Sequence, residues 1–229
     1  MSISLIKKND IIIIDNEIMN LIKTIISYLN IQNNNNKKKP LLILGPSGVG
    51  KDTMINILLK KYPKIFYKLP SYTTRKMRPG EKEGVDYFFI TKEEFEKMKN
   101  EKKLFGIQKY NDNFYASNKS KLEELVKKGD KIIILNYNIE TVEAVKDEID
   151  FNFVAILPPC EAELKNRLEK RGTNKTEMEK RMESSLREMR LINEANYIKF
   201  RVINDEINKC FEKLENHIKE IYPDFFRHI

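Results

Sequence analysis

One segment of the chain, Gly45-Pro46-Ser47-Gly48-Val49-Gly50-Lys51, restricts the possible folds more than any other. It follows the apolar run 41–44 and precedes residues 52–61, whose apolar positions have helical spacing. A glycine-rich turn between a buried strand and a helix points successive backbone N–H groups at phosphate oxygens, and the helix dipole adds positive charge there. The sequence therefore predicts a phosphate-binding loop that holds ATP, with Lys51 bridging the terminal phosphates.

The residue after this lysine is Asp52, where the phosphate-loop motif has serine or threonine. Thr53 comes one residue later, and we expect its hydroxyl to lie near Mg²⁺ bound with ATP. Asp52 has two possible roles. It either points away as a favourable charge in the first turn of the helix, which is the more common arrangement, or it faces the metal.

Apolar runs and helical patterns alternate through the rest of the chain. This alternation predicts an α/β fold, a parallel sheet with helices on both faces. The expected strands are 41–44, 85–90, 132–135, 153–157 and 200–203; the expected helices are 52–61, a helix opened by a Thr91/Glu94 capping box, 119–128, 161–171, 176–196 and one from 205; a hairpin is expected over 104–115.

Composition excludes several classes of protein. With 41% hydrophobic residues among 229, the chain has enough apolar material for a core, and it contains no apolar run of about 20 residues that would span a membrane. Two isolated cysteines favour neither a disulfide scaffold nor a zinc site, and a cytoplasmic location is expected. The net charge of +8 favours a polyanionic ligand. Nucleic acid is not the expected partner, because arginines such as Arg75 and Arg78 stand at positions suited to binding the phosphate of a small ligand.

The first 39 residues form an extension separate from the domain expected over residues 40–229. A polar run, 33–40, ends in a proline and is typical of a flexible linker. Before it, residues 16–30 place isoleucines and leucines on one helical stripe, which predicts a helix packed on the domain or on a second subunit. Because no arginine occurs before the linker and acidic residues do, a transit peptide is disfavoured.

A second polar segment, 71–81, carries Arg75 and Arg78 and is followed by Gly84-Val85-Asp86-Tyr87. Arginine offers bidentate donors to a dianionic phosphate, and a tyrosine hydroxyl adds a neutral donor. The order Ser-x-Thr-Thr-Arg-x-x-Arg-x-Gly-Glu and then Gly-x-Asp-Tyr, together with the phosphate loop, resembles the guanylate kinase family. The resemblance extends over about residues 40–222.

The resemblance implies a small subdomain that binds the nucleoside monophosphate, a helical lid, ATP and GMP as substrates, and Mg²⁺ as cofactor. Ser71 matches the serine that contacts guanine, and Asn204 matches the asparagine beside the adenine. By position in the family motifs, the GMP ligands would be Ser71, Arg75, Arg78, Tyr87, Tyr115 and Asn138, and the catalytic cations would be Lys51 with the lid residues Arg167, Arg171 and Arg181.

The chain departs from the family where the base would bind. Counting back from Tyr115, Gly106 stands at the position of a glutamate that accepts hydrogen bonds from guanine. Asn136 and Asn138 replace the two carboxylates of an Asp-x-Asp segment. An asparagine carries no charge to hold a metal or to offset two N–H donors. We therefore expect intact phosphate recognition and weaker base recognition, with a water beside Gly106.

These observations favour ATP-dependent phosphoryl transfer to a nucleoside monophosphate, by resemblance GMP. Two alternatives stay open. Kinases of ribose 1,5-bisphosphate are similar to guanylate kinase and also have Gly-Lys-Asp in the phosphate loop. Non-catalytic guanylate-kinase-like binding modules usually lose the phosphate loop, which this chain retains.

Overall fold

The computed structural model describes residues 7–8, 11–12, 21, 24, 39–110, 112–170 and 175–227, the side chains of 175–177 excepted. The chain divides into two compact units, residues 1–37 and 38–229. In the first unit, β1 (Lys7–Lys8) pairs with β2 (Ile11–Ile12) in antiparallel orientation, and Leu21 and Thr24 are helical. The rest of the helix expected over 16–30 lies outside the described residues. Within the described part of the chain, no helix is long and apolar enough to span a membrane.

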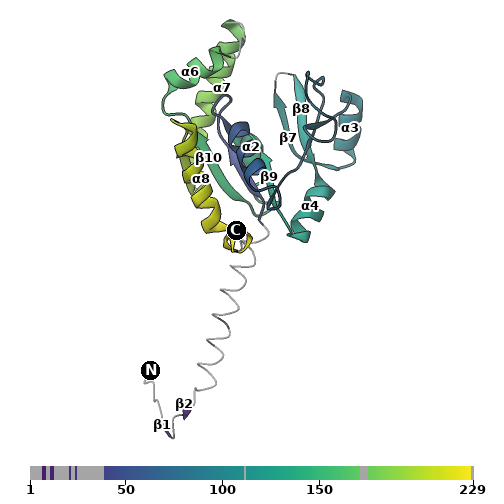
Figure 1. Cartoon of the computed structure of the whole chain (residues 1–229). Helices are drawn as coiled ribbons and strands as arrows, with labels where there is room; N and C mark the ends of the chain where they lie inside the picture. Colours follow the sequence, from purple (N-terminus) through teal and green to yellow (C-terminus); the bar gives the residue numbers. More distant parts are fainter. Residues whose placement is uncertain are drawn as a thin grey trace. The chain divides into compact units, whose positions relative to one another are not determined.

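The second unit is built on a five-stranded sheet whose strands are all parallel (Figure 1). The first predicted strand, β3, lies at its centre, where a strand without charged residues can be buried on both faces. The strand order is β11 (Phe200–Ile203), β10 (Asn152–Leu157), β3 (Leu41–Leu44), β9 (Ile132–Asn136) and β4 (Phe66–Lys68).

Helices cover both faces of this sheet, as the sequence predicts. Because side chains alternate along a strand, Leu41 and Ile43 pack on one face and Leu42 and Leu44 on the other. The first face packs against α2 (Lys51–Lys61) and α8 (Ile207–Ile221), which is followed by α9 (Pro223–Phe226). The second packs against α4 (Lys119–Lys128), α5 (Ile139–Val145) and α7 (Lys175–Glu194). Helix α6 (Glu161–Glu169) leads from β10 toward α7.

A second, four-stranded sheet forms a small subdomain with its own apolar cluster around the buried Phe95. Its strand order is β6 (Tyr87–Phe89), β5 (Ser71–Thr73), β8 (Asn113–Asn118) and β7 (Leu104–Tyr110). Helix α3 (Lys92–Asn100) begins at the predicted capping box, in which Thr91 accepts from the Glu94 N–H and Glu94 from the Thr91 N–H. Figure 1 shows α3, β7 and β8 on the side of α2 away from α6 and α7.

Three of the short elements that were not predicted are β4 and β5, which follow each other in the chain and belong to the two different sheets, and α5, which follows β9. Each of the two strands has three residues, and α5 has seven, which is too few for a periodic pattern. The expected strand 85–90 is shortened to Tyr87–Phe89, and the expected helix 161–171 ends at Glu169.

Candidate active site

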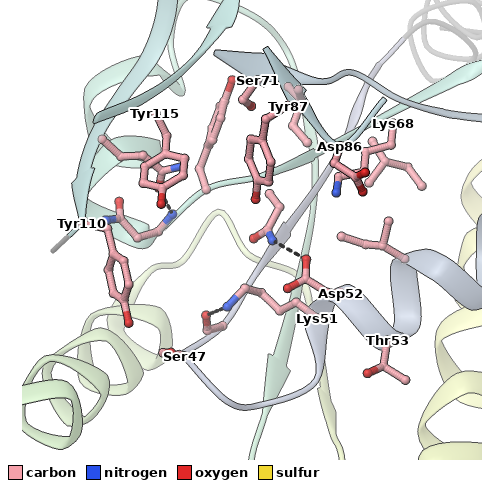
Figure 2. A pocket seen from close by; sticks show the side chains of 18 of the residues that line it. Ser47, Lys51, Asp52, Thr53, Lys68, Ser71, Asp86, Tyr87, Tyr110 and Tyr115 are labelled. Carbon is pink, nitrogen blue, oxygen red and sulfur yellow. Dashed lines mark hydrogen bonds between the residues drawn. The ribbon is translucent and has the colours of Figure 1, made fainter. Parts of the chain in front are cut away.

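A cavity of about 280 Å³ lies among the two sheets and α7, near the lower limit for ligand pockets. The glycine-rich turn, residues 45–50, and the start of α2 line one side, and side chains from β5, β6 and the β7–β8 hairpin line the other (Figure 2). Most of the residues predicted from sequence are part of its lining: Gly45, Ser47, Gly48, Gly50, Lys51, Asp52, Thr53, Ser71, Arg78, Tyr87, Tyr115 and Asn138. Pro46, Val49, Arg75, Arg167, Arg181 and Asn204 are not, and Arg171 lies outside the described residues.

The glycine-rich turn is held from behind by Asn204. This buried side chain donates from Nδ2 to the Val49 carbonyl oxygen at 2.7 Å. Gly50, the N-cap of α2, has φ 102°, and a Cβ there would lie 2.5 Å from Asn204 Nδ2. A glycine is therefore required at position 50 by both backbone conformation and contact. Lys51 Nζ donates to the carbonyl oxygens of Gly45 and, at 3.1 Å, Pro46, which places its charge over the turn.

Asp52 and Thr53 differ in their relation to the cavity. Asp52 Oδ1 accepts from Asn136 Nδ2 at 3.4 Å, so its carboxylate faces the end of β9. Figure 2 shows Asp52 directed toward the cavity and Thr53 farther along α2. Of the two roles considered for Asp52, this orientation is the one expected if the carboxylate faces the metal, and that role stays a prediction. Of these two side chains, only Asp52 on α2 is a carboxylate, whereas Asn136 at the end of β9 is a neutral amide.

Arg75 lies behind the cavity wall in an ion pair with Glu81. Its Nη1 and Nη2 donate to the two Glu81 carboxylate oxygens at 2.9 and 2.8 Å, and the guanidinium lies 5.2 Å from the Tyr87 ring centroid. Glu81 also accepts from the Arg78 N–H at 2.8 Å. The hydrogen bonds from Arg75 lower the pKa of Glu81 to about 2. This carboxylate therefore fixes the conformation of the arginine loop at every physiological pH.

Arg78, Tyr87, Tyr115 and Ser71 form the wall opposite Lys51. The rings of Tyr87 and Tyr115 meet edge to face with centroids 5.9 Å apart, and burial raises the pKa of Tyr87. The Tyr87 phenol is therefore a neutral donor near pH 7. The exposed side chain of Arg78 adds the positive charge on this side of the cavity.

The lid arginines approach the site from α6 and α7. Arg167 donates from Nε to Glu163 at 2.8 Å and from Nη2 to the Asn204 carbonyl oxygen at 2.9 Å, which connects α6 to the residue behind the glycine-rich turn. The Arg181 guanidinium lies 5.9 Å from the ring centroid of Tyr110 on β7. Neither arginine lines the cavity in this conformation.

At the far end of the cavity, Tyr137 fills the space beside Gly106. A Cβ built on Gly106 would lie 2.5 Å from Tyr137 Cζ and 2.8 Å from its hydroxyl oxygen, and φ at Gly106 is 63°. The buried hydroxyl of Tyr137 donates to Ser117 Oγ at 2.7 Å. The tyrosine ring therefore occupies the space that a side chain at position 106 would enter, and the water expected beside Gly106 stays a prediction.

Comparison with known proteins gives a consistent result. The protein-family model described as guanylate kinase matches residues 37–221. The chain belongs to the guanylate kinase family. Guanylate kinase of Latilactobacillus sakei is 33% identical over 186 residues, 80% of this chain and 90% of the relative. That of Schizosaccharomyces pombe is 35% identical over 181 residues, covering 78% and 89%, and that of Clostridium perfringens strain SM101 is 37% identical over 183 residues, covering 79% and 82%.

A solved structure supports the same architecture. The crystal structure of guanylate kinase from Anaplasma phagocytophilum has a TM-score of 0.63 and 24% identity, covering 80% of this chain and 85% of that chain. The predicted α/β fold with a parallel central sheet is confirmed.

Among the side chains of this guanylate kinase family member that line the cavity and were not predicted are Gln108, Tyr110 and Glu188. Glu188 lies seven residues after Arg181 on α7, two helical turns along one face, and this spacing is a signal that the sequence contains. Its Oε1 is shielded from solvent without a hydrogen-bond partner among the described residues. Burial raises the pKa of Glu188 to about 7, while the charge of Lys51 acts in the opposite direction.

Proposed function

We propose that this chain transfers the terminal phosphoryl group of ATP to the phosphate of GMP, giving ADP and GDP. The observation that carries the proposal is that a single cavity has Lys51 and the glycine-rich turn on one side and Arg78, Tyr87 and Tyr115 on the other. Two sets of phosphate-binding groups facing each other fit a reaction between two phosphates. The names of the relatives support the choice of GMP.

On the donor side, backbone N–H groups of residues 45–50, except Pro46, which has none, would bind the ATP phosphates. Lys51 Nζ would leave its two carbonyl oxygens for the phosphate oxygens, since a charged acceptor binds an ammonium group more strongly than a neutral carbonyl does. Asn204 keeps the turn in shape through its bond to Val49. The family resemblance implies that Asn204 lies beside the adenine. Because its amide donates to the backbone of the turn, we expect it to act mainly by positioning the turn.

The residues around Asp52 fit a Mg²⁺ ion that arrives with ATP. Within the described chain, no three acidic, histidine or cysteine side chains gather to hold a metal by themselves. Mg²⁺ bound with nucleotide needs only one or two protein oxygens beside phosphates and waters. Asp52 and Thr53, adjacent at the start of α2, would supply them, and the ion would neutralise charge on the phosphates.

On the acceptor side, Arg78, Tyr87 and Tyr115 would bind the GMP phosphate. Arg75 is paired with Glu81 and stacks on Tyr87. It would therefore orient the Tyr87 ring and add positive charge near the phosphate. Ser71 and Asn138 would contact the base. Positioning the two substrates in line supplies most of the rate acceleration for this kind of transfer, since no covalent intermediate with the protein is needed.

The lid would complete the site. Arg181, now over the Tyr110 ring, would move with Arg167 and Arg171 onto the transferring phosphoryl group, whose charge they would neutralise. Neither alternative from the sequence analysis receives comparable support. The relatives are named guanylate kinase, and the glycine-rich turn that binding modules lose is intact here.

The proposal is tested by incubating the full chain with ATP, GMP and Mg²⁺ and separating nucleotides by anion-exchange chromatography. GDP and ADP should appear in equal amounts, and chelation of Mg²⁺ should stop their formation. Lys51→Ala should abolish transfer with an unchanged circular dichroism spectrum, whereas Lys60→Ala, an exposed lysine on the same helix, should not. ADP without GDP, or equal rates in Lys51→Ala, would refute the proposal.

A further inference from the structure

Strand β7 borders the end of the cavity where the base is proposed to bind, beside Tyr137. At position 106 this strand cannot present a side chain to the cavity. Tyr137 fills the adjacent space, and its hydroxyl is bonded to Ser117. The positive φ of 63° at Gly106 adds a backbone penalty for any other residue. If β7 contributes a base contact, it must come from another residue.

Gln108 is the residue of β7 that the structure brings into this position. A β-bulge between Phe105 and Gln108 shifts the register so that Gln108 lies directly opposite Tyr115 on β8. Residues directly opposite each other in an antiparallel pair project to the same face of the sheet. Both line the cavity, so Gln108 lies next to the tyrosine proposed to bind the acceptor phosphate.

The carboxamide of Gln108 is only weakly engaged. Its Oε1 accepts from the Asn138 backbone N–H at 3.4 Å, longer than a normal hydrogen bond, and its Nε2 has no partner among the described residues. The neighbouring amide of Asn138 is more constrained, because its Oδ1 accepts from the Thr141 N–H at 2.9 Å and caps α5. Gln108 therefore has an unused Nε2 donor and a weakly held acceptor, whereas the acceptor of Asn138 is taken up by the helix cap.

We propose that Gln108 hydrogen-bonds the base of the acceptor nucleotide and sets the base specificity of the enzyme, an inference that rests on the proposed function. A neutral carboxamide has one acceptor and two donors. It can pair with the N–H and carbonyl groups of guanine, and equally with the amino group and ring nitrogen of adenine. A carboxylate, which only accepts, would favour the two adjacent N–H donors of guanine. This chain is therefore expected to discriminate guanine from adenine less sharply than an enzyme with a carboxylate in this role.

The test compares Gln108→Ala and Gln108→Glu with Lys109→Ala, a change at the adjacent exposed residue, whose side chain projects to the other face of β7. For each protein, kcat/KM is measured with GMP and with AMP at saturating ATP, and GMP binding is measured by calorimetry. Gln108→Ala should lower kcat/KM for GMP by about 3- to 10-fold, the effect of one lost hydrogen bond, without changing the KM for ATP. Gln108→Glu should raise the GMP-to-AMP ratio by about 10-fold, since bonds to a charged acceptor are stronger.

The outcomes separate this inference from the proposed function. Wild-type ratios and GMP affinities in both Gln108 variants of an active enzyme would overturn the role of Gln108 alone. An inactive wild type whose GMP binding is weakened by Gln108→Ala and not by Lys109→Ala would refute phosphoryl transfer and support the base contact. A protein that neither binds nor phosphorylates GMP would overturn both.

Discussion

The ring of Tyr137 occupies the space into which a side chain at position 106 would extend, with its Cζ 2.5 Å from the Cβ that such a residue would have. Tyr137 is fully buried and hydrogen-bonded to Ser117, so it cannot move aside at low cost. A carboxylate side chain at position 106 of β7 and the ring of Tyr137, the residue after β9, would therefore need the same space. Tyr137 therefore closes the cavity at the end where the base is proposed to bind, while most of the residues expected to bind the two phosphates line the rest of it.

This packing predicts that Gly106→Ala is more destabilising than an ordinary substitution of a glycine. Gly80 provides the control, because it also has a positive φ, 86°, but a Cβ added there would meet no atom within 4 Å. Gly80→Ala should cost about 1 kcal/mol of unfolding free energy for the left-handed backbone. Gly106→Ala should cost about 1–3 kcal/mol more, from overpacking against Tyr137. Urea unfolding measures both, and equal costs would show that the ring moves freely.

We expect a substitution in the arginine loop to weaken the binding of GMP and not the binding of ATP. Arg78→Ala removes one positive charge from the acceptor side of the cavity, so KM for GMP should rise by roughly one to two orders of magnitude, matching about 1.5–3 kcal/mol for a charge-assisted contact. KM for ATP should stay near its wild-type value. Lys76→Ala, an exposed neighbour on the same loop, is the matched control. Unchanged steady-state constants in Arg78→Ala would make the loop a solvated surface.

Much of the fold follows from short-range signals in the sequence. The glycine-rich turn, the Thr91 capping box and the end of the helix expected over 119–128, which Gly129 caps, all stand where the pattern predicts, because each depends on local hydrogen bonds or on a left-handed glycine. Strands β4 and β5 escape prediction, since three residues contain no period, and their place depends on pairing with β9 and β8.

The candidate site likewise contains residues that the sequence predicts and residues that it does not. Most residues of the two motifs expected to bind phosphate line one cavity, and spacing alone could single them out because each motif is contiguous in the chain. Gln108 and Tyr137 could not, since their roles depend on a β-bulge and on a contact across 31 positions of sequence, Gly106 to Tyr137. The direction of Asp52 likewise depends on a distant residue, Asn136, which lies 84 positions later in the sequence.

The extension before the domain is predicted to be dispensable for catalysis. A chain that begins at Lys39 keeps the ion pair from Lys39 to Asp150 at 2.7 Å and the bond from the Tyr222 hydroxyl to the Lys39 carbonyl oxygen at 2.9 Å. It should retain the kcat/KM of the full chain. If residues 16–30 mediate self-association, sedimentation should show a smaller species. A chain that begins at Leu41 loses both contacts and should unfold at lower temperature. A folded but inactive Lys39 truncation would show that the extension builds part of the site.

Glu188 gives a prediction about pH. Burial raises its pKa from 4.5 to about 7, with Glu140 adding to the rise and Lys51 and the Ile139 N–H opposing it. The folded state then binds the proton more tightly than the unfolded state, so this residue lowers stability as pH rises from about 4.5 to about 7. Relative to wild type, Glu188→Gln should gain on the order of 1 kcal/mol of unfolding free energy between pH 5 and pH 8. Glu194→Gln, exposed on the same helix, should show no such trend, and a pH-independent difference for Glu188→Gln would contradict the assignment.

The central claim is that the acceptor is a nucleoside monophosphate held mainly by its phosphate, with GMP preferred through neutral base contacts. The most direct measurement is kcat/KM in a coupled assay of ADP release with GMP, dGMP, AMP, UMP and ribose 1,5-bisphosphate, at saturating ATP and Mg²⁺. The account predicts the highest value for GMP, a measurable value for AMP, and none for the sugar bisphosphate. Turnover with ribose 1,5-bisphosphate above that with every nucleotide would contradict it.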